Sequence, residues 1–137
     1  MQEPYIIKFP KIGSSGEGYI SVAERKDLPF EVKRIYWTYF TPGSLQRGGH
    51  AHHELQQILV AVAGEIIVTT QMPGGEEKRT VLKSAFEGIY LPKYCCHIMK
   101  YSHNAVQMCI ANIPYQESDY IKDYKEFQSL PYDTSNS

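Results

Sequence analysis

The chain has 137 residues, with 14 lysine and arginine residues against 15 aspartate and glutamate residues and a formal net charge of −1. This length suits one domain that can bury its own core. The charge balance gives no electrostatic reason to expect nucleic acid or an anionic membrane surface as a partner. Basic side chains that matter for function should therefore act locally, in a pocket.

Cysteine usage and the N-terminal segment bear on the compartment. The cysteines are odd in number, and two are adjacent (Cys95, Cys96 and Cys109), which suits neither a disulfide framework nor a C-x-x-C zinc motif. The start, Met1–Pro4, lacks the basic segment and apolar core of a signal peptide. The longest apolar run, Ile58–Gly64, is far shorter than a membrane span. These features predict a reduced, soluble, cytoplasmic protein.

Short segments rich in β-branched and aromatic residues recur along the chain and are separated by turn residues. Strands are predicted, in chain order, at Tyr5–Phe9, Tyr19–Glu24, Val32–Phe40, Gly49–Ala51, Gln56–Ala63, Glu65–Gln71, Lys78–Leu82, Glu87–Leu91, His97–Tyr101 and Ala105–Ile110. The breaks between them have turn chemistry, as in Gly13–Gly16, Thr41–Gly43 and Pro73–Gly75. Many short strands at this spacing are typical of a sandwich or barrel.

One helix is predicted, at Glu117–Phe127. Ser118 can cap it, and its apolar residues fall near one face: Tyr120, Ile121, Tyr124 and Phe127. No repeat, linker or low-complexity tract divides the chain. The sequence therefore predicts a single all-β domain over residues 1–137 with a short C-terminal helix.

Histidines crowd into the segment Arg47–His53. His50 and His52 are two residues apart on a predicted strand, so their side chains should project from the same face with Cα atoms about 7 Å apart. Gly48 and Gly49 precede them and allow a sharp backbone turn into the strand. Paired histidines beside an arginine are costly to bury without a role, and this favours a functional site over satisfied polar residues.

The layout of this segment resembles the cupin superfamily, which folds as a β-barrel of jelly-roll type. The resemblance rests on the H-x-H pair, on Gly64 about a dozen residues later, and on the late histidine His97 that follows Pro92. In metal-binding cupins a glutamate and three histidines hold one metal ion. Glutamines stand here where that glutamate would be (Gln56 and Gln57), and a neutral carboxamide is a poorer ligand than a carboxylate. We therefore expect a site without metal or other cofactor.

Several phrases are more specific and resemble the TDP-4-oxo-6-deoxy-D-glucose 3,4-ketoisomerases, the WxcM-like or FdtA-type cupins. They are Lys33–Trp37, Arg47–His52, Leu55–Val60, Gly88–Pro92 with His97, and Asp119–Ile121. The similarity runs from about residue 5 to residue 128. Cys96 departs from it, since a Trp stands there in close relatives, and it adjoins His97 in the expected pocket wall.

The resemblance implies a 4-keto to 3-keto isomerisation on a TDP-linked 6-deoxyhexose, ahead of an aminotransferase that makes a 3-amino sugar. A histidine at position 97 accompanies the galacto-type product in that family, and the family is dimeric. The implied substrate is TDP-4-keto-6-deoxyglucose.

The residues suit this chemistry. Two histidines with ordinary pKa values near 6.5 can act as base and as proton shuttle, and the sequence leaves open which of His50 and His52 does which. Arg47 and Tyr36 are candidates to stabilise the enediolate, and Arg34 or Arg47 to bind the diphosphate. Three other residues are predicted to contact the substrate: Gln57, Tyr90 and His97.

Each assignment has an alternative. Arg34 could be an exposed strand cation, Tyr36 could be packing, and Gln57 could merely hydrogen-bond a histidine. For the whole chain the alternatives are a TDP-4-keto-sugar 3,5-epimerase, a metal-dependent cupin that uses Gln57 or Glu54 as a fourth ligand, and a sugar-binding cupin without catalysis.

The N-terminal segment predicts how the chain assembles. Tyr5–Phe9 is β-prone and precedes a Gly- and Ser-rich stretch, Gly13–Gly18, which could act as a hinge. Small barrels leave open sheet edges that need cover. We therefore expect a homodimer with exchanged N-terminal strands.

Overall fold

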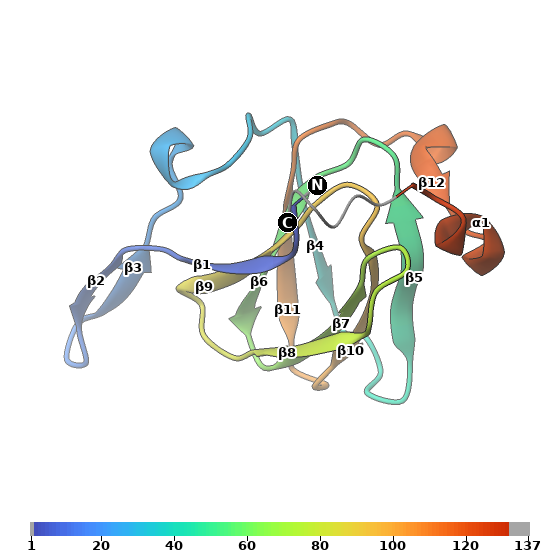
Figure 1. The fold of residues 1–137 in the computed structure, drawn as a ribbon. Helices are drawn as coiled ribbons and strands as arrows, with labels where there is room; N and C mark the ends of the chain where they lie inside the picture. The colour runs from blue at the N-terminus through green and yellow to red at the C-terminus, as the bar shows by residue number, and fades with distance from the viewer. Residues whose placement is uncertain (1, 132–137) are drawn as a thin grey trace.

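The computed structural model describes residues 2–131 and consists of two facing sheets with a short helix at one side (Figure 1). The first sheet has the order β1-β9-β6-β11-β4, from Tyr5–Lys8, Glu87–Leu91, Gln57–Ala63, Val106–Ala111 and Arg34–Tyr39. The second has the order β12-β5-β10-β7-β8, from Tyr120–Ile121, Gln46–His52, Cys96–Tyr101, Ile66–Gln71 and Lys78–Leu82. The paired strands are antiparallel throughout. The predicted all-β, jelly-roll fold of cupin type is confirmed.

The main core lies between the two sheets because alternate residues of facing strands point inward. Leu59, Ile89 and Cys109 of the first sheet meet Val68 and Met99 of the second in one buried cluster. The intervening residues of the first sheet point to its other face, where segments before β4 cover them: Phe9, Leu28 and Phe30 pack on Ile58, Val60, Tyr90 and Ile110. The central strands β6 and β9 are thus buried on both faces along most of their length, which explains their continuous apolar runs.

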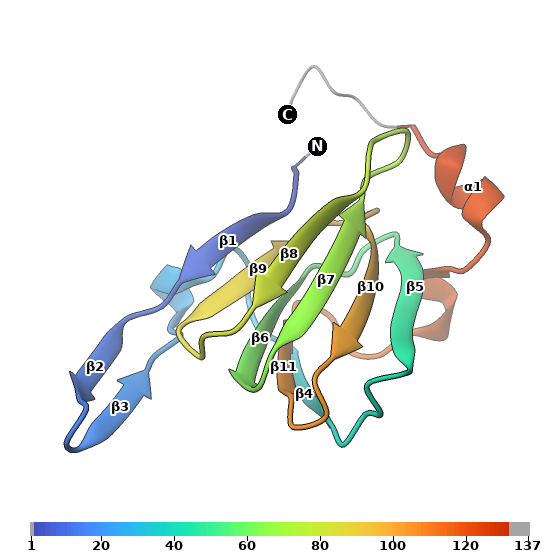
Figure 2. The same cartoon turned by 90° about the horizontal axis from the view of Figure 1, so that it is seen from below.

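The predicted strands match the structure apart from their ends and the N-terminal hairpin. β2 (Lys11–Ser14) pairs with β3 (Gly18–Ser21) in a two-stranded hairpin that projects from the body (Figure 2). The expectation of a hinge at Gly13–Gly18 is wrong. Gly13 has φ +134°, and a Cβ there would lie 2.1 Å from the carbonyl oxygen of Gly18, so this glycine permits close strand pairing.

The predicted helix at Glu117–Phe127 is wrong in its first half. Glu117–Asp119 form a 3-10 turn, Tyr120–Ile121 form β12 against β5, and α1 covers only Tyr124–Gln128. Asp123 caps α1, because its side chain accepts a hydrogen bond from the Lys125 amide. Ile121 and Phe127 still share a buried cluster with Ala51. The apolar spacing therefore reflects burial on either side of a turn.

No helix within residues 2–131 is long and apolar enough to cross a membrane. A second 3-10 turn at Arg25–Asp27 lies in the connection between β3 and β4.

Candidate active site

A cavity of about 380 Å³ opens between the two sheets, near the β5 edge of the second sheet. Its walls come from both sheets and from the connection after β11. The lining residues are Arg34, Tyr36 and Thr38 of β4, Arg47, Gly48, His50 and His52 of β5, Leu55, Gln57 of β6, His97, Met99 and Tyr101 of β10, Gln107 of β11, Tyr115, and Tyr120 of β12. Most of these side chains are polar or aromatic, which suits a polar ligand with a ring.

A β-bulge on β5 brings its functional residues onto one face. His97 pairs with His50 and Ile98 with Gly48, so Gly49 is an extra residue with no partner on β10. His50 and His52 share a face by ordinary alternation, whereas Arg47 would point away from them in a regular strand. Because of the extra residue, the Arg47 side chain points to the cavity side instead. Gly48 and Gly49 have φ values of +93° and +84°, which only glycine adopts without strain.

Strand β4 supplies the opposite wall by simple alternation. Arg34, Tyr36 and Thr38 line the cavity, so the predicted common face of Arg34 and Tyr36 is confirmed. The guanidinium of Arg34 lies 5.1 Å from the ring centre of Tyr36 and 5.9 Å from that of Tyr115. Its Nε is buried and has no hydrogen-bond partner within the described part of the chain. A buried donor of this kind is suited to receive an anionic ligand.

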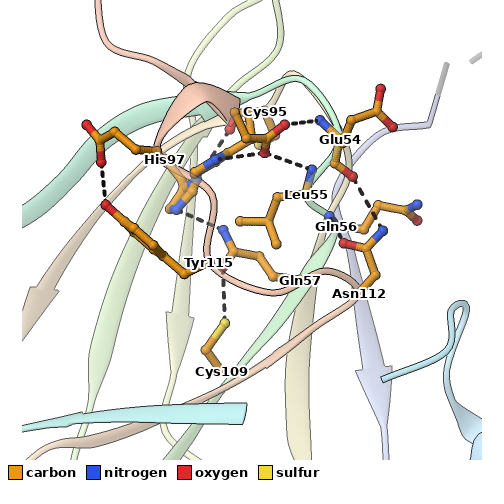
Figure 3. A network of polar contacts seen from close by, with 12 residues as sticks. Glu54, Leu55, Gln56, Gln57, Cys95, His97, Cys109, Asn112 and Tyr115 are labelled. Carbon is orange, nitrogen blue, oxygen red and sulfur yellow. Dashed lines mark hydrogen bonds and ion pairs between the residues drawn. The ribbon is translucent and has the colours of Figure 1, made fainter. Parts of the chain in front are cut away.

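A chain of hydrogen bonds centred on Gln57 fixes the floor of the cavity (Figure 3). The Gln57 Oε1 accepts from the Tyr36 hydroxyl at 3.3 Å and from the Cys109 thiol at 3.1 Å. The Gln57 Nε2 therefore faces His97 Nε2, 3.1 Å away, as a donor. His97 Nδ1 lies 3.3 Å from the Cys95 carbonyl and donates to it. This assignment leaves His97 neutral, with both ring nitrogens engaged.

Electrostatics agree with this network. Burial lowers the pKa of His97 to about 4, so the ring is uncharged at neutral pH. Burial also raises the pKa of the Tyr36 phenol far above its ordinary value, although nearby Arg34 partly opposes the shift. Tyr36 is therefore a permanent hydroxyl donor at the cavity wall.

His52 has a partner that the sequence did not reveal. Asp119 Oδ2 lies 3.3 Å from His52 Nδ1, and both side chains are more than nine-tenths buried. The contact is too poorly aligned to count as a hydrogen bond and acts chiefly through charge. Burial lowers the pKa of His52, and the Asp119 carboxylate opposes that shift. The contact was not predicted, because Asp119 fell within the segment that the apolar spacing predicted as a helix.

His50 is in a different environment. It is half-buried, and its Nδ1 has no hydrogen-bond partner among the described residues. Its ring packs edge-on against Tyr120, with ring centres 5.5 Å apart, and the same tyrosine packs against His52 at 4.4 Å. Tyr120 therefore contacts the rings of both histidines.

Tyr90 is the predicted substrate contact that the structure places elsewhere. It is 1% exposed in the cluster on the outer face of the first sheet, and its hydroxyl donates to Gln56 and Gln2. Its β9 neighbours Ile89 and Leu91 face the main core, so alternation turns Tyr90 away from the cavity. The Cys96 side chain also packs away from the cavity, beside Ala51 and Phe127. Cys96 is therefore not among the residues that line the cavity beside His97.

The side chains fit a metal ion poorly. No group of three or more His, Cys, Asp or Glu side chains within residues 2–131 is arranged to hold one. His97 Nε2 accepts from Gln57, so its lone pair is already used. Glu54, the alternative ligand, binds Lys93 through its carboxylate at 3.2 Å.

Comparison with known proteins shows the family to which the chain belongs. The family described as FdtA, "WxcM-like, C-terminal", matches residues 2–131. The chain belongs to the FdtA family. A curated relative, TDP-4-oxo-6-deoxy-alpha-D-glucose-3,4-oxoisomerase of Aneurinibacillus thermoaerophilus, is 35% identical over 127 residues, which cover 92% of this chain and 91% of the relative. The predicted resemblance is confirmed.

Solved structures of the family have the same fold. A 3,4-ketoisomerase from Helicobacter canadensis has a TM-score of 0.87 at 32% identity, covering 93% of this chain and 96% of its own. A mutant of the 3,4-ketoisomerase QdtA from Thermoanaerobacterium thermosaccharolyticum, in complex with TDP-4-keto-6-deoxyglucose, has a TM-score of 0.87 at 28% identity, covering 93% of each chain. The family is thus one of nucleotide-sugar isomerases.

Proposed function

We propose that this protein is a nucleotide-sugar 3,4-ketoisomerase that converts TDP-4-keto-6-deoxyglucose to a TDP-3-keto-6-deoxyhexose. The observation that carries the proposal is the cavity itself, where His50 and His52 face Arg34, Arg47 and Tyr36 in a chain of the FdtA family. Relatives named for this activity support the substrate.

The reaction needs a base that removes the proton from C3 of the sugar. His52 suits this role because Asp119 faces its Nδ1, which leaves Nε2 as the nitrogen available to the cavity. The lowered pKa of His52 keeps it unprotonated at neutral pH, ready to accept a proton. The structure thus favours His52 as base, a choice that the sequence left open.

The enediolate that follows must move a proton between O3 and O4 and be reprotonated at C4. His50 suits the transfer between the two oxygens, because it is less buried than His52 and lies beside it on the same face. The Arg47 guanidinium can stabilise the negative charge on the enediolate oxygens, and so can the Tyr36 hydroxyl when its proton turns from Gln57 Oε1 to the ligand. No step requires a metal or an organic cofactor.

The diphosphate is assigned to Arg34. Its Nε is a buried donor without a hydrogen-bond partner among the described residues, and its guanidinium lies near the rings of Tyr36 and Tyr115. A guanidinium gives phosphate oxygens a planar pair of donors. Arg47 lies exposed at the cavity rim, where it can reach either the diphosphate or the sugar.

The proposed product has the galacto configuration at C4, and an aminotransferase would consume it to make a 3-amino sugar. Support for the configuration comes from the family resemblance, in which a histidine at position 97 accompanies the galacto-type product, and His97 lines the cavity here as a neutral side chain.

The proposal extends to a homodimer with exchanged N-terminal strands. In this structure β1 pairs with β9 of its own chain, from Tyr5 opposite Tyr90 to Lys8 opposite Glu87. The β2–β3 hairpin is exposed along its whole length, and the outer face of β4 exposes Ile35, Trp37 and Tyr39. These apolar surfaces favour a second copy as their cover.

Incubation with TDP-4-keto-6-deoxyglucose, followed by NMR of the nucleotide sugar, tests the function. The expected result is a TDP-3-keto-6-deoxyhexose whose H4–H5 coupling reports the galacto configuration. An unchanged 4-keto sugar would contradict the proposed function, and inversion at C5 would indicate an epimerase.

A further inference from the structure

We propose that Asp119 is a positioning residue for catalysis, which holds the His52 ring in the orientation and tautomer that a base requires. The inference rests on the proposed role of His52. It concerns a residue that contacts the histidine and does not itself line the cavity.

The Asp119 carboxylate is held from two sides by the backbone that follows His52. Its Oδ1 accepts from the Glu54 amide at 2.7 Å, and its Oδ2 accepts from the Leu55 amide at 3.1 Å. The Asp119 carbonyl in turn accepts from the His53 amide at 3.1 Å. The aspartate therefore has a fixed place relative to β5, and its residual charge is directed at His52 Nδ1.

The pairing of β12 with β5 keeps the two groups in register. Tyr120 lies opposite His52 and Ile121 opposite Ala51, so the residue before Tyr120 is carried to the His52 ring. The Tyr120 ring also packs edge-on against His52, with ring centres 4.4 Å apart. The imidazole thus contacts both a carboxylate and an aromatic ring.

A buried carboxylate 3.3 Å from Nδ1 favours the tautomer with the proton on Nδ1, because the positive end of that N–H dipole then lies beside the negative charge. The lone pair is then on Nε2, toward the cavity. Charged and titratable groups from several elements face His52: Asp119, His50, Arg34, His97 and Tyr120. Among these, Asp119 is the acidic group that opposes the effect of burial on the pKa of His52.

The substitution Asp119→Asn tests the proposal. It keeps one oxygen for the Glu54 or Leu55 amide but replaces the charge, and its NH₂ group favours a proton on Nε2 of His52. We expect kcat to fall by about a hundredfold, the scale of a lost general base, while the Kd for TDP stays within about twofold. The acid limb of the kcat/KM profile should move to lower pH, because the pKa of His52 falls without the carboxylate.

Asp123→Asn is the matched control. Asp123 is an exposed aspartate four residues along the same segment, and it also accepts a backbone N–H, from Lys125 at 2.9 Å. This variant should keep wild-type kcat and the wild-type pH profile. A loss of activity in both variants, or wild-type kcat in Asp119→Asn, would overturn the proposal.

A direct measurement on the wild-type protein does not depend on the folding of Asp119→Asn. ¹⁵N NMR of the wild-type protein should show His52 with its proton on Nδ1, assigned by the resonances that vanish in His52→Asn. A proton on Nε2 of the free protein would overturn the positioning role even if Asp119→Asn fails to fold. Failure of the proposed function is a separate outcome, since the wild-type protein would then not convert the sugar while the tautomer could still be read.

Discussion

His50 and His52 lie two residues apart on one strand face, yet their surroundings differ. His52 is buried against Asp119, whereas His50 is half-buried and its Nδ1 has no hydrogen-bond partner in the described part of the chain. Neighbouring groups that differ in this way can divide the roles of base and shuttle between two chemically identical side chains. Under the proposed mechanism, this difference assigns the base to His52 and the proton shuttle to His50.

The substitutions His50→Asn and His52→Asn should each lower kcat by at least about a hundredfold, because each removes a group that transfers a proton. Asparagine retains polarity and similar size, so both proteins should keep the wild-type circular dichroism spectrum and unfolding midpoint. If either variant turns over at the wild-type rate, that histidine is outside the proton relay.

Metal independence is expected because Gln57 stands where metal cupins carry glutamate and because its amide already donates to His97. Dialysis against a strong chelator should leave kcat unchanged, and elemental analysis should find no stoichiometric transition metal. Activity that is lost on dialysis and restored by one divalent ion would favour the metal-dependent alternative.

Most side chains of the site could be predicted from the sequence, because strand alternation alone places His50 with His52 and Arg34 with Tyr36. Asp119 could not be predicted as their partner. Its contact joins segments 67 residues apart, and local apolar spacing pointed to a helix there. Tyr90 was predicted as a contact from a motif, but its strand parity turns it into the core.

Among the elements, strand β5 depends most on its glycines. The bulge at Gly49 brings Arg47 to the side of the histidines, and a Cβ on Gly48 would lie 2.6 Å from the His97 carbonyl oxygen. The R-G-G-H phrase indicated a sharp backbone turn, but the bulge depends on pairing with β10. That pairing is a tertiary feature, which the segment alone does not encode.

Gly48→Ala should lower the free energy of unfolding by about 1–3 kcal/mol through backbone strain, and by more where the new Cβ meets the His97 carbonyl. Gly49→Ala is the control, since its φ is also positive but no atom lies within 4 Å of its Cβ position. Urea unfolding should therefore find Gly48→Ala the less stable of the two. Equal stability would mean that β5 and β10 are not held as closely as described.

At the scale of the whole molecule, the fold of two facing sheets follows from short strands of alternating or continuous apolar residues, and the sequence predicted this fold class. The β2–β3 hairpin could not be predicted from the sequence, because the residues of Gly13–Gly18 favour a turn and a hinge equally. In the structure this stretch closes the β2–β3 hairpin. Apolar side chains are exposed on the hairpin and on the outer face of β4.

A homodimer that depends on the N-terminal strand should lose stability when residues 1–12 are removed, because the β9 edge would lose its partner β1. Light scattering of the full-length protein at micromolar concentration should give the mass of a dimer, and the truncated protein should be smaller or unfold at lower temperature. A full-length monomer would contradict the expectation, as would a truncated dimer of equal stability.

The proposed function requires that side chains of the cavity move protons between C3 and C4 of a TDP-linked 4-keto sugar. The most direct test is NMR of the product formed from TDP-4-keto-6-deoxyglucose in D₂O. We expect a TDP-3-keto-6-deoxyhexose with deuterium at C4, formed by the wild-type protein and not by His52→Asn. A sugar that remains a 4-ketone, or that acquires deuterium at C5, would contradict the account.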